Sequence, residues 1–136
     1  MNEWSLLVGV CMLIAAVVLA WIMAWPERRF RRELASRSPM DADQFYQSFY
    51  VTNGVPADIP RRLRPIYAKF FGLDETRLHP FDRPPELDEI DEVELFDEIE
   101  GEFGVTISDK DAENIDGSFD SIVQYLTART RQGGLS

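Results

Sequence analysis

The chain has 136 residues and a formal net charge of −10, with 14 Lys and Arg against 24 Asp and Glu. Its one cysteine, Cys11, excludes an internal disulfide and a cluster of thiolate metal ligands. The acidic balance also argues against nucleic acid as a partner, because the soluble part would repel phosphate groups.

The first predicted element is a transmembrane helix over residues 4–25. Residues 5–24 carry no charged side chain, and a helix of this length spans about 30 Å, the thickness of a bilayer's hydrocarbon core. The alternative is a cleaved signal peptide, but "MNEW" contains no base and no A-x-A site follows. Trp4, Trp21 and Trp25 flank the stretch, as interfacial aromatic residues do.

A basic juxtamembrane segment, residues 26–37, follows with five arginines, while nothing basic precedes the span. The positive-inside rule predicts a single-pass protein of the plasma or inner membrane, with its N-terminus outside and its C-terminal part in the cytoplasm. The bilayer is the expected partner here, because anionic lipid attracts each nearby arginine by about 1 kcal/mol. The predicted membrane-surface residues are Arg28, Arg29, Arg31 and Arg32.

An aromatic helix followed by a turn is predicted over residues 38–55. Ser38 is the expected N-cap and Pro39 the first helical residue. The helical spacing of the aromatic residues predicts a face that packs in a core: Phe45, Tyr46, Phe49 and Tyr50. An Asn-Gly pair and Pro56 then mark the turn.

Residues 56–131 predict a small helical domain. Its first helix is expected to begin at Asp58, the predicted cap, and to end at Gly72. Because Pro65 removes a backbone hydrogen bond, this helix is expected either to bend or to start late. A proline-rich loop follows, in which His79, the only histidine, is expected to have no metal or catalytic role.

The next helix is predicted within residues 85–103, which contain ten acidic residues and no basic one. Asp88 is the expected cap. The spacing of the apolar residues predicts an inward stripe formed by Ile90, Val93, Phe96, Ile99 and Phe103.

Two further helices complete the prediction. Ser108 caps a short one over residues 108–114, and Ser118 caps the last, with four residues directed inward: Phe119, Ile122, Val123 and Leu126. Residues 132–136 are predicted to be a flexible tail. No segment alternates as a strand does, so the predicted class is all-α: one transmembrane helix followed by a three- to four-helix bundle.

Residues 87–126, "LDEIDEVELFDEIEGEFGVTISDKDAENIDGSFDSIVQYL", resemble the second half of an acyl carrier protein. The family pattern D-S-L-D-x-V-E-L, an acidic helix, E-x-x-F, I-x-D-x-x-A-E-x-I and a final helix is followed without a gap. Ile90 replaces the leucine of D-S-L, and one further position is an exception. The resemblance implies an acyl-carrier-like bundle and recognition by partner enzymes through the acidic helix.

That exception is the serine to which the family attaches 4′-phosphopantetheine. The triplet here is Asp88-Glu89-Ile90, and a carboxylate cannot replace the attacking hydroxyl. We therefore expect no cofactor. Glu89 is explained most simply as a favourable first-turn acid, and alternatively as a mimic of the missing phosphate charge.

The acidic helix has two interpretations, a solvated surface or a site for a basic partner. Residues 86–120 hold 15 acids and one base, and the i,i+4 row of like charges at Glu94, Glu98 and Glu102 is unfavourable within the helix. A basic partner surface would relieve this repulsion. The predicted partner-binding residues are Asp88, Glu89, Asp91, Glu92, Glu94, Glu98 and Glu102.

The sequence thus predicts a non-enzymatic, membrane-anchored binding or adaptor protein, or an accessory subunit of a membrane complex. Its partner would be a lipid-metabolism enzyme or a larger membrane complex. The alternative is a genuine acyl carrier modified at an unusual site. No nucleophile–base pair, phosphate loop or metal-ligand spacing favours an enzyme.

Overall fold

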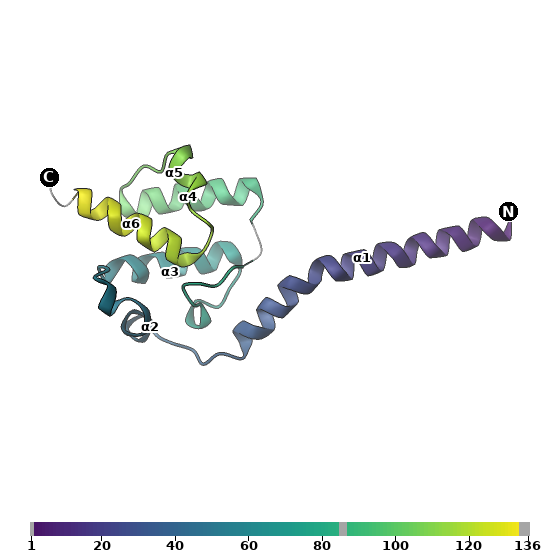
Figure 1. Ribbon diagram of the computed structural model, residues 1–136, viewed down its shortest axis with the longest axis horizontal. Coiled ribbons are helices and arrows are strands. Elements are labelled where there is room, and N and C mark those ends of the chain that lie inside the picture. The colour runs from purple at the N-terminus through teal and green to yellow at the C-terminus, as the bar shows by residue number, and fades with distance from the viewer. Residues whose placement is uncertain (1, 85–86, 134–136) are drawn as a thin grey trace. The chain divides into compact units, whose positions relative to one another are not determined.

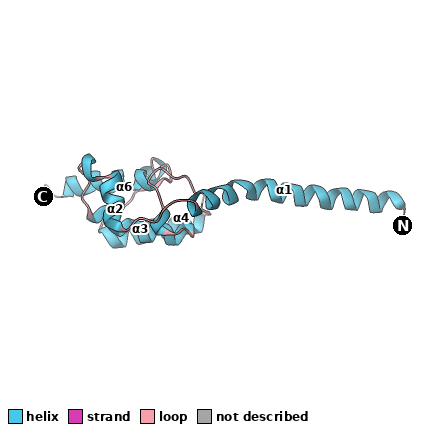
Figure 2. Cartoon of the chain, turned by 90° about the horizontal axis from the view of Figure 1, so that it is seen from below, coloured by secondary structure: helices cyan, strands magenta, loops and turns pink. Residues whose placement is uncertain are grey.

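The computed structural model describes residues 2–84 and 87–133, and the chain divides into two compact units, one ending at Ala35 and one beginning at Ser36. The described residues form helices and loops without a strand (Figures 1 and 2), which confirms the all-α class. The α-helices are α1 (Glu3–Ala35), α2 (Ala42–Phe49), α3 (Asp58–Phe71), α4 (Glu89–Phe103), α5 (Asp109–Glu113) and α6 (Phe119–Gly133). Two short 3₁₀ turns are η1 (Val51–Asn53) and η2 (Glu75–Arg77).

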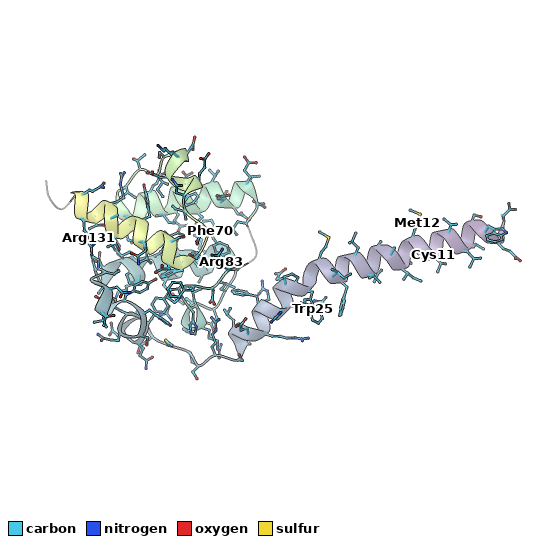
Figure 3. The ribbon with its side chains drawn as sticks, viewed as in Figure 1. Cys11, Met12, Trp25, Phe70, Arg83 and Arg131 are labelled. Atoms are coloured by element: carbon cyan, nitrogen blue, oxygen red, sulfur yellow. The ribbon has the colours of Figure 1, made fainter. Side chains whose placement is uncertain are left out.

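The first unit is the single helix α1, which continues without a break through Pro26 and most of the arginine-rich segment. The large apolar side chains between Trp4 and Trp25 are exposed around the helix, whereas Leu34 near its end is buried, and Figure 3 shows Cys11, Met12 and Trp25 extending from it. In the described part of the chain, α1 is the one helix long and apolar enough to cross a membrane, with a mean hydropathy of 2.9 over its most apolar window.

The second unit is a bundle in which α3 packs against α4, α6 and α2 (Figure 1). Its core contains fully buried side chains from each of these helices. Phe45 and Tyr50 are part of this core, and Tyr46 and Phe49 pack against it. The aromatic face therefore has the packing role that its spacing predicted.

The start of α2 differs from the prediction, because the cap is Asp41 rather than Ser38. The Asp41 carboxylate accepts a bond from the Gln44 backbone N–H at 2.8 Å, and the Gln44 side chain accepts one from the Asp41 N–H at 3.0 Å. This reciprocal capping box satisfies two N–H groups at once. Met40, just before the cap, is not helical, and its backbone N–H donates a hydrogen bond to the Thr76 carbonyl.

Helix α3 also begins differently, because Ala57 occupies the cap position and Asp58 is the first helical residue. The helix is continuous through Pro65, so it neither splits nor starts late. Gly72 ends it, as predicted, with a left-handed φ of 63° that a side chain would disfavour.

The inward face of α4 differs most from the prediction. Leu95 and Ile99 are buried and Phe96 and Phe103 half-buried, but Ile90 is 71% and Val93 56% exposed. Successive steps of three residues drift around a helix, since each residue turns it by about 100°. Ile90 lies nine residues before Ile99, about 900° of rotation, and therefore on the opposite side.

The last two helices agree with the prediction. Ser108 caps α5, and the Ser118 hydroxyl accepts a bond from the Ser121 N–H at 3.2 Å at the start of α6. The four predicted inward residues of α6 are all buried. Helix α6 continues to Gly133, two residues into the predicted tail, and residues 134–136 lie outside the described residues.

The register of α4 can be tested by paired substitutions. Leu95→Ala removes a buried side chain, and we expect it to lower the free energy of unfolding by about 2–5 kcal/mol. Ile90→Ala removes an exposed one, and the expected change is within about 0.5 kcal/mol. Urea denaturation followed by circular dichroism measures both, and an equal loss from the two variants would contradict this register.

Candidate functional site

The outward face of α4 is a surface on which exposed apolar and acidic side chains alternate. Ile90 and Val93 are exposed there together with Glu89, Glu94 and Asp97. Because Leu95 and Ile99 fix the inward side, helical geometry directs Ile90, Val93, Glu94 and Asp97 away from the core, while Glu89 is exposed on the flank in the first turn. We call this set the α4 ridge.

Not all predicted partner-binding acids lie on the α4 ridge. Glu98 is bound by Lys69 of α3 at 2.9 Å, and Glu102 by the Arg62 Nε at 2.9 Å. Arg62 also donates to the Glu102 carbonyl. Two of the four acids in the C-terminal half of α4, Glu98 and Glu102, therefore have basic partners within the domain, and basic residues of α3 partly offset the repulsion in the predicted acidic row.

The part of α4 from its cap to Asp97, mostly its N-terminal half, has a different electrostatic environment. Asp88 accepts the Asp91 N–H at 2.8 Å as the helix cap. Among the described residues, no ion pair joins Glu89, Glu94 or Asp97 to a base. Negative charge is thus concentrated around Ile90 and Val93, whereas Glu86 of the acidic run lies outside the described residues.

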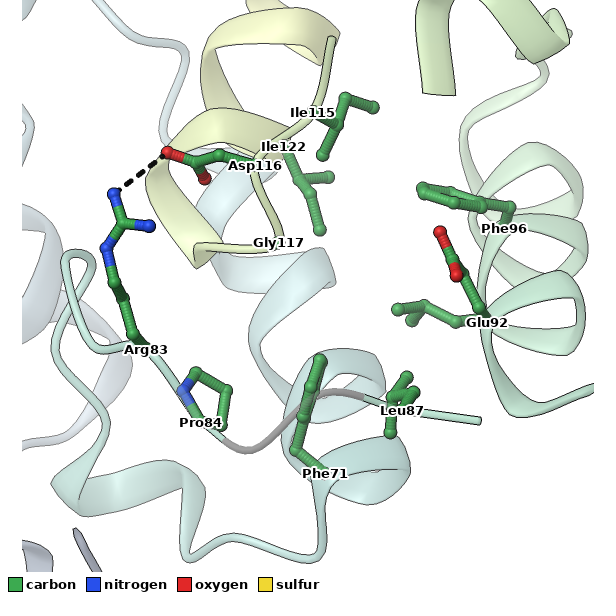
Figure 4. Close-up of a pocket in the computed structure, with 11 residues that line it drawn as sticks. Phe71, Arg83, Pro84, Leu87, Glu92, Phe96, Ile115, Asp116, Gly117 and Ile122 are labelled. Atoms are coloured by element: carbon green, nitrogen blue, oxygen red, sulfur yellow. Dashed lines mark hydrogen bonds and ion pairs between the residues drawn. The ribbon is translucent and has the colours of Figure 1, made fainter. Parts of the chain in front are cut away.

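A pocket of about 410 Å³ lies beside this half of α4 (Figure 4). Glu92 and Phe96 line one side of it from α4, and Arg83 and Pro84 line the other. The remaining lining residues are mostly apolar: Phe71, Leu87, Leu95, Ile115, Asp116, Gly117 and Ile122. Sequence periodicity alone did not reveal this pocket, because it is formed by parts of five separate segments.

The rim of the pocket carries charge. Arg83 contacts Asp116 at 3.4 Å in an exposed ion pair. Hydrogen bonds from Ser118 lower the pKa of the Asp116 carboxyl, and Arg83 acts in the same direction. Asp116 is therefore charged at neutral pH, so the rim presents one cation and two anions, Asp116 and Glu92.

The pocket can hold an apolar group, but its lining contains no serine, threonine, cysteine, histidine or lysine. A nucleophile or a general base of those types is therefore missing from its described walls. No group of three metal-ligating side chains occurs among residues 2–84 and 87–133. His79 is half-buried in the loop after η2, with its ring 5.2 Å from that of Phe49.

The predicted membrane-surface residues lie on α1, in its last turns. Arg28, Arg29, Arg31 and Arg32 are exposed, and Arg31 pairs with Glu27 at 3.2 Å. Since α1 is helical to Ala35, the ten residues after Trp25 extend for about 15 Å, roughly two to three times the depth of about 5–7.5 Å that the headgroup region adds on one side of a bilayer.

Comparison with known proteins gives one informative result. No family model matches the chain, and no solved structure does. The chain is similar to an acyl carrier protein of Rubrobacter xylanophilus, with 35% identity over 77 residues. The match covers 52% of this chain and 95% of that protein. Because nearly the whole length of that relative is matched at this identity, the chain belongs to the acyl carrier protein family.

Proposed function

We propose that the chain is a membrane-anchored, non-enzymatic binding module that presents the α4 ridge to a protein partner. The observation that carries the proposal is the exposure of Ile90 and Val93 among acids that no base within the described domain neutralises. Helix α1 is the anchor, and the basic residues at its end contact anionic lipid headgroups.

The α4 ridge fits a partner surface that is both apolar and basic. Burial of an isoleucine or valine side chain contributes about 1.5–3 kcal/mol, which supplies affinity. Basic side chains on the partner would relieve the repulsion among Glu89, Glu94 and Asp97 and would speed the encounter. The pairing of Glu98 and Glu102 with α3 supports a contact centred on Ile90 and Val93, in the N-terminal half of the helix.

The family resemblance indicates what kind of partner this is. Enzymes that act on acyl carrier proteins recognise the acidic helix, and Glu89 stands where the family carries its modified serine. An enzyme of lipid metabolism, or a membrane complex containing one, is therefore the proposed partner. Tethering to the bilayer raises the effective concentration of such neighbours.

The α4 ridge is tested by capture of partners from membranes solubilised in mild detergent, using the full chain tagged at its C-terminus. Partners retained at low salt should be lost at high salt, because screening shortens the range of charge attraction. The triple variant Glu89→Gln, Glu94→Gln, Asp97→Asn should lower recovery at least about tenfold.

The matched control is Glu98→Gln with Glu102→Gln on the same helix. It removes two acids that already have partners within the domain, so recovery should stay within about twofold of the unchanged chain. Equal recovery from the triple variant and the unchanged chain would remove the α4 ridge as the binding surface.

The proposed orientation places the N-terminus outside the cell. With Cys11→Ser as background, a membrane-impermeant maleimide should label Glu3→Cys in intact cells. Asp97→Cys should react only after permeabilisation, because the positive-inside rule keeps the domain in the cytoplasm. The reverse pattern of labelling would overturn the orientation.

The pocket favours a second candidate function, that of a true acyl carrier, because its apolar walls suit an acyl group. Ser118 and Ser121, the described serines nearest to it in sequence, are engaged in capping bonds of α6. We therefore expect the intact mass to stay unchanged after incubation with coenzyme A and a phosphopantetheinyl transferase. An increase by one phosphopantetheine group would establish the carrier function instead.

A further inference from the structure

Arg37, the last of the five arginines after the membrane span, has surroundings unlike those of the others. Its side chain is only 16% exposed, and its guanidinium binds both oxygens of the Asp82 carboxylate, at 2.6 and 2.7 Å. Asp82 is itself 8% exposed. A bidentate pair of this kind is both directional and strong. Arg37 is thus a largely buried structural cation of the second unit.

Backbone groups surround this ion pair. The Arg37 Nη1 also donates to the Arg77 carbonyl at 3.2 Å, and the Arg77 Nε donates to the Arg37 carbonyl at 3.0 Å. The Asp82 carboxylate accepts a further bond from the His79 N–H at 2.9 Å. The Arg37–Asp82 ion pair therefore connects the segment that follows α1 with the loop that follows η2.

The segment held in this way forms part of the pocket. Asp82 is followed directly by Arg83 and Pro84, which line one side of it (Figure 4). Residues 78–84 lie in none of the helices. Their conformation depends on long-range contacts, such as the bond from the Asp120 N–H to the Pro80 carbonyl at 2.9 Å.

We propose that Arg37 is a positioning residue, whose ion pair with Asp82 holds residues 78–84 in the conformation that forms this wall of the pocket. Without the guanidinium, a nearly buried carboxylate would have no cation, and the segment would have to move to hydrate it. The geometry of the pocket is thereby set by a residue outside the resemblance to the acyl carrier family. The proposal does not depend on the function proposed above.

Hydrogen exchange of backbone amides in the full chain, held in detergent micelles, tests this directly. Arg37→Gln and Asp82→Asn should each speed exchange at the His79 and Asp82 amides by at least roughly tenfold, because these amides bond within the clamped turn. Exchange at Val123 and Leu126 in the core of α6 should change by less than about twofold, which separates local release from unfolding of the domain.

The matched control is Arg61→Gln, which breaks the exposed Arg61–Asp43 pair of 2.8 Å and should leave residues 78–84 unchanged. In the exchanged pair, Arg37→Asp with Asp82→Arg, the amide of residue 82 should regain much of its protection through the His79 carbonyl, whereas the His79 amide should stay fast because an arginine side chain offers it no acceptor. Two outcomes would overturn the proposal: unchanged exchange at His79 and Asp82 in both single variants, or equal acceleration at these amides and in α6.

Discussion

The burial of Leu95 and Ile99 is the contact on which the organisation of the soluble domain depends. The two side chains lie about 40° apart around α4 and join the core with residues of α3 and α6. Once they face inward, Ile90, Glu94 and Asp97 must face outward. The same contact that stabilises the bundle therefore creates its apolar and acidic surface.

Helix α3 completes this arrangement because it supplies both apolar and basic side chains. Leu63 and Tyr67 are buried in the core, while Arg62 and Lys69 reach Glu102 and Glu98. Arg62 also lies over the Phe103 ring, 4.6 Å from its centroid. These contacts pair Glu98 and Glu102 within the domain, whereas no ion pair among the described residues joins Glu89 or Glu94 to a base.

The elements of the fold followed from local sequence signals, whereas the orientation of α4 did not. Caps at Asp88, Ser108 and Ser118 and the stop at Gly72 are local, and each was found where predicted. The predicted apolar stripe of α4 was wrong at its N-terminal end, because a step of three residues falls about 60° short of a full helical turn. Three such steps, from Ile90 to Ile99, add up to a difference of about 180°. Leu95 shows the correct face, since it precedes Ile99 by four residues.

The parts of the site that depend on distant pairs could not be predicted from one sequence. Arg37 and Asp82 are 45 residues apart, and the charge pattern after residue 25 placed Arg37 only in the basic juxtamembrane segment. The pocket likewise requires five segments to meet. Asp41, in contrast, could have been predicted from a local signal that was overlooked. Gln44 lies three residues later, which is the spacing of a capping box.

The residues between α1 and the family-like half are part of the folded domain. Phe45 makes an edge contact with Phe119, with ring centroids 5.5 Å apart, and the Tyr50 hydroxyl donates to Asp120 at 2.9 Å. Burial and this bond raise the pKa of Tyr50 well above its ordinary value, so its hydroxyl keeps the proton that it donates. Without α2 and Tyr50, the start of α6 would lose an aromatic contact and a hydrogen bond. The acyl-carrier-like fold of this chain is therefore completed by an N-terminal addition that begins directly after α1.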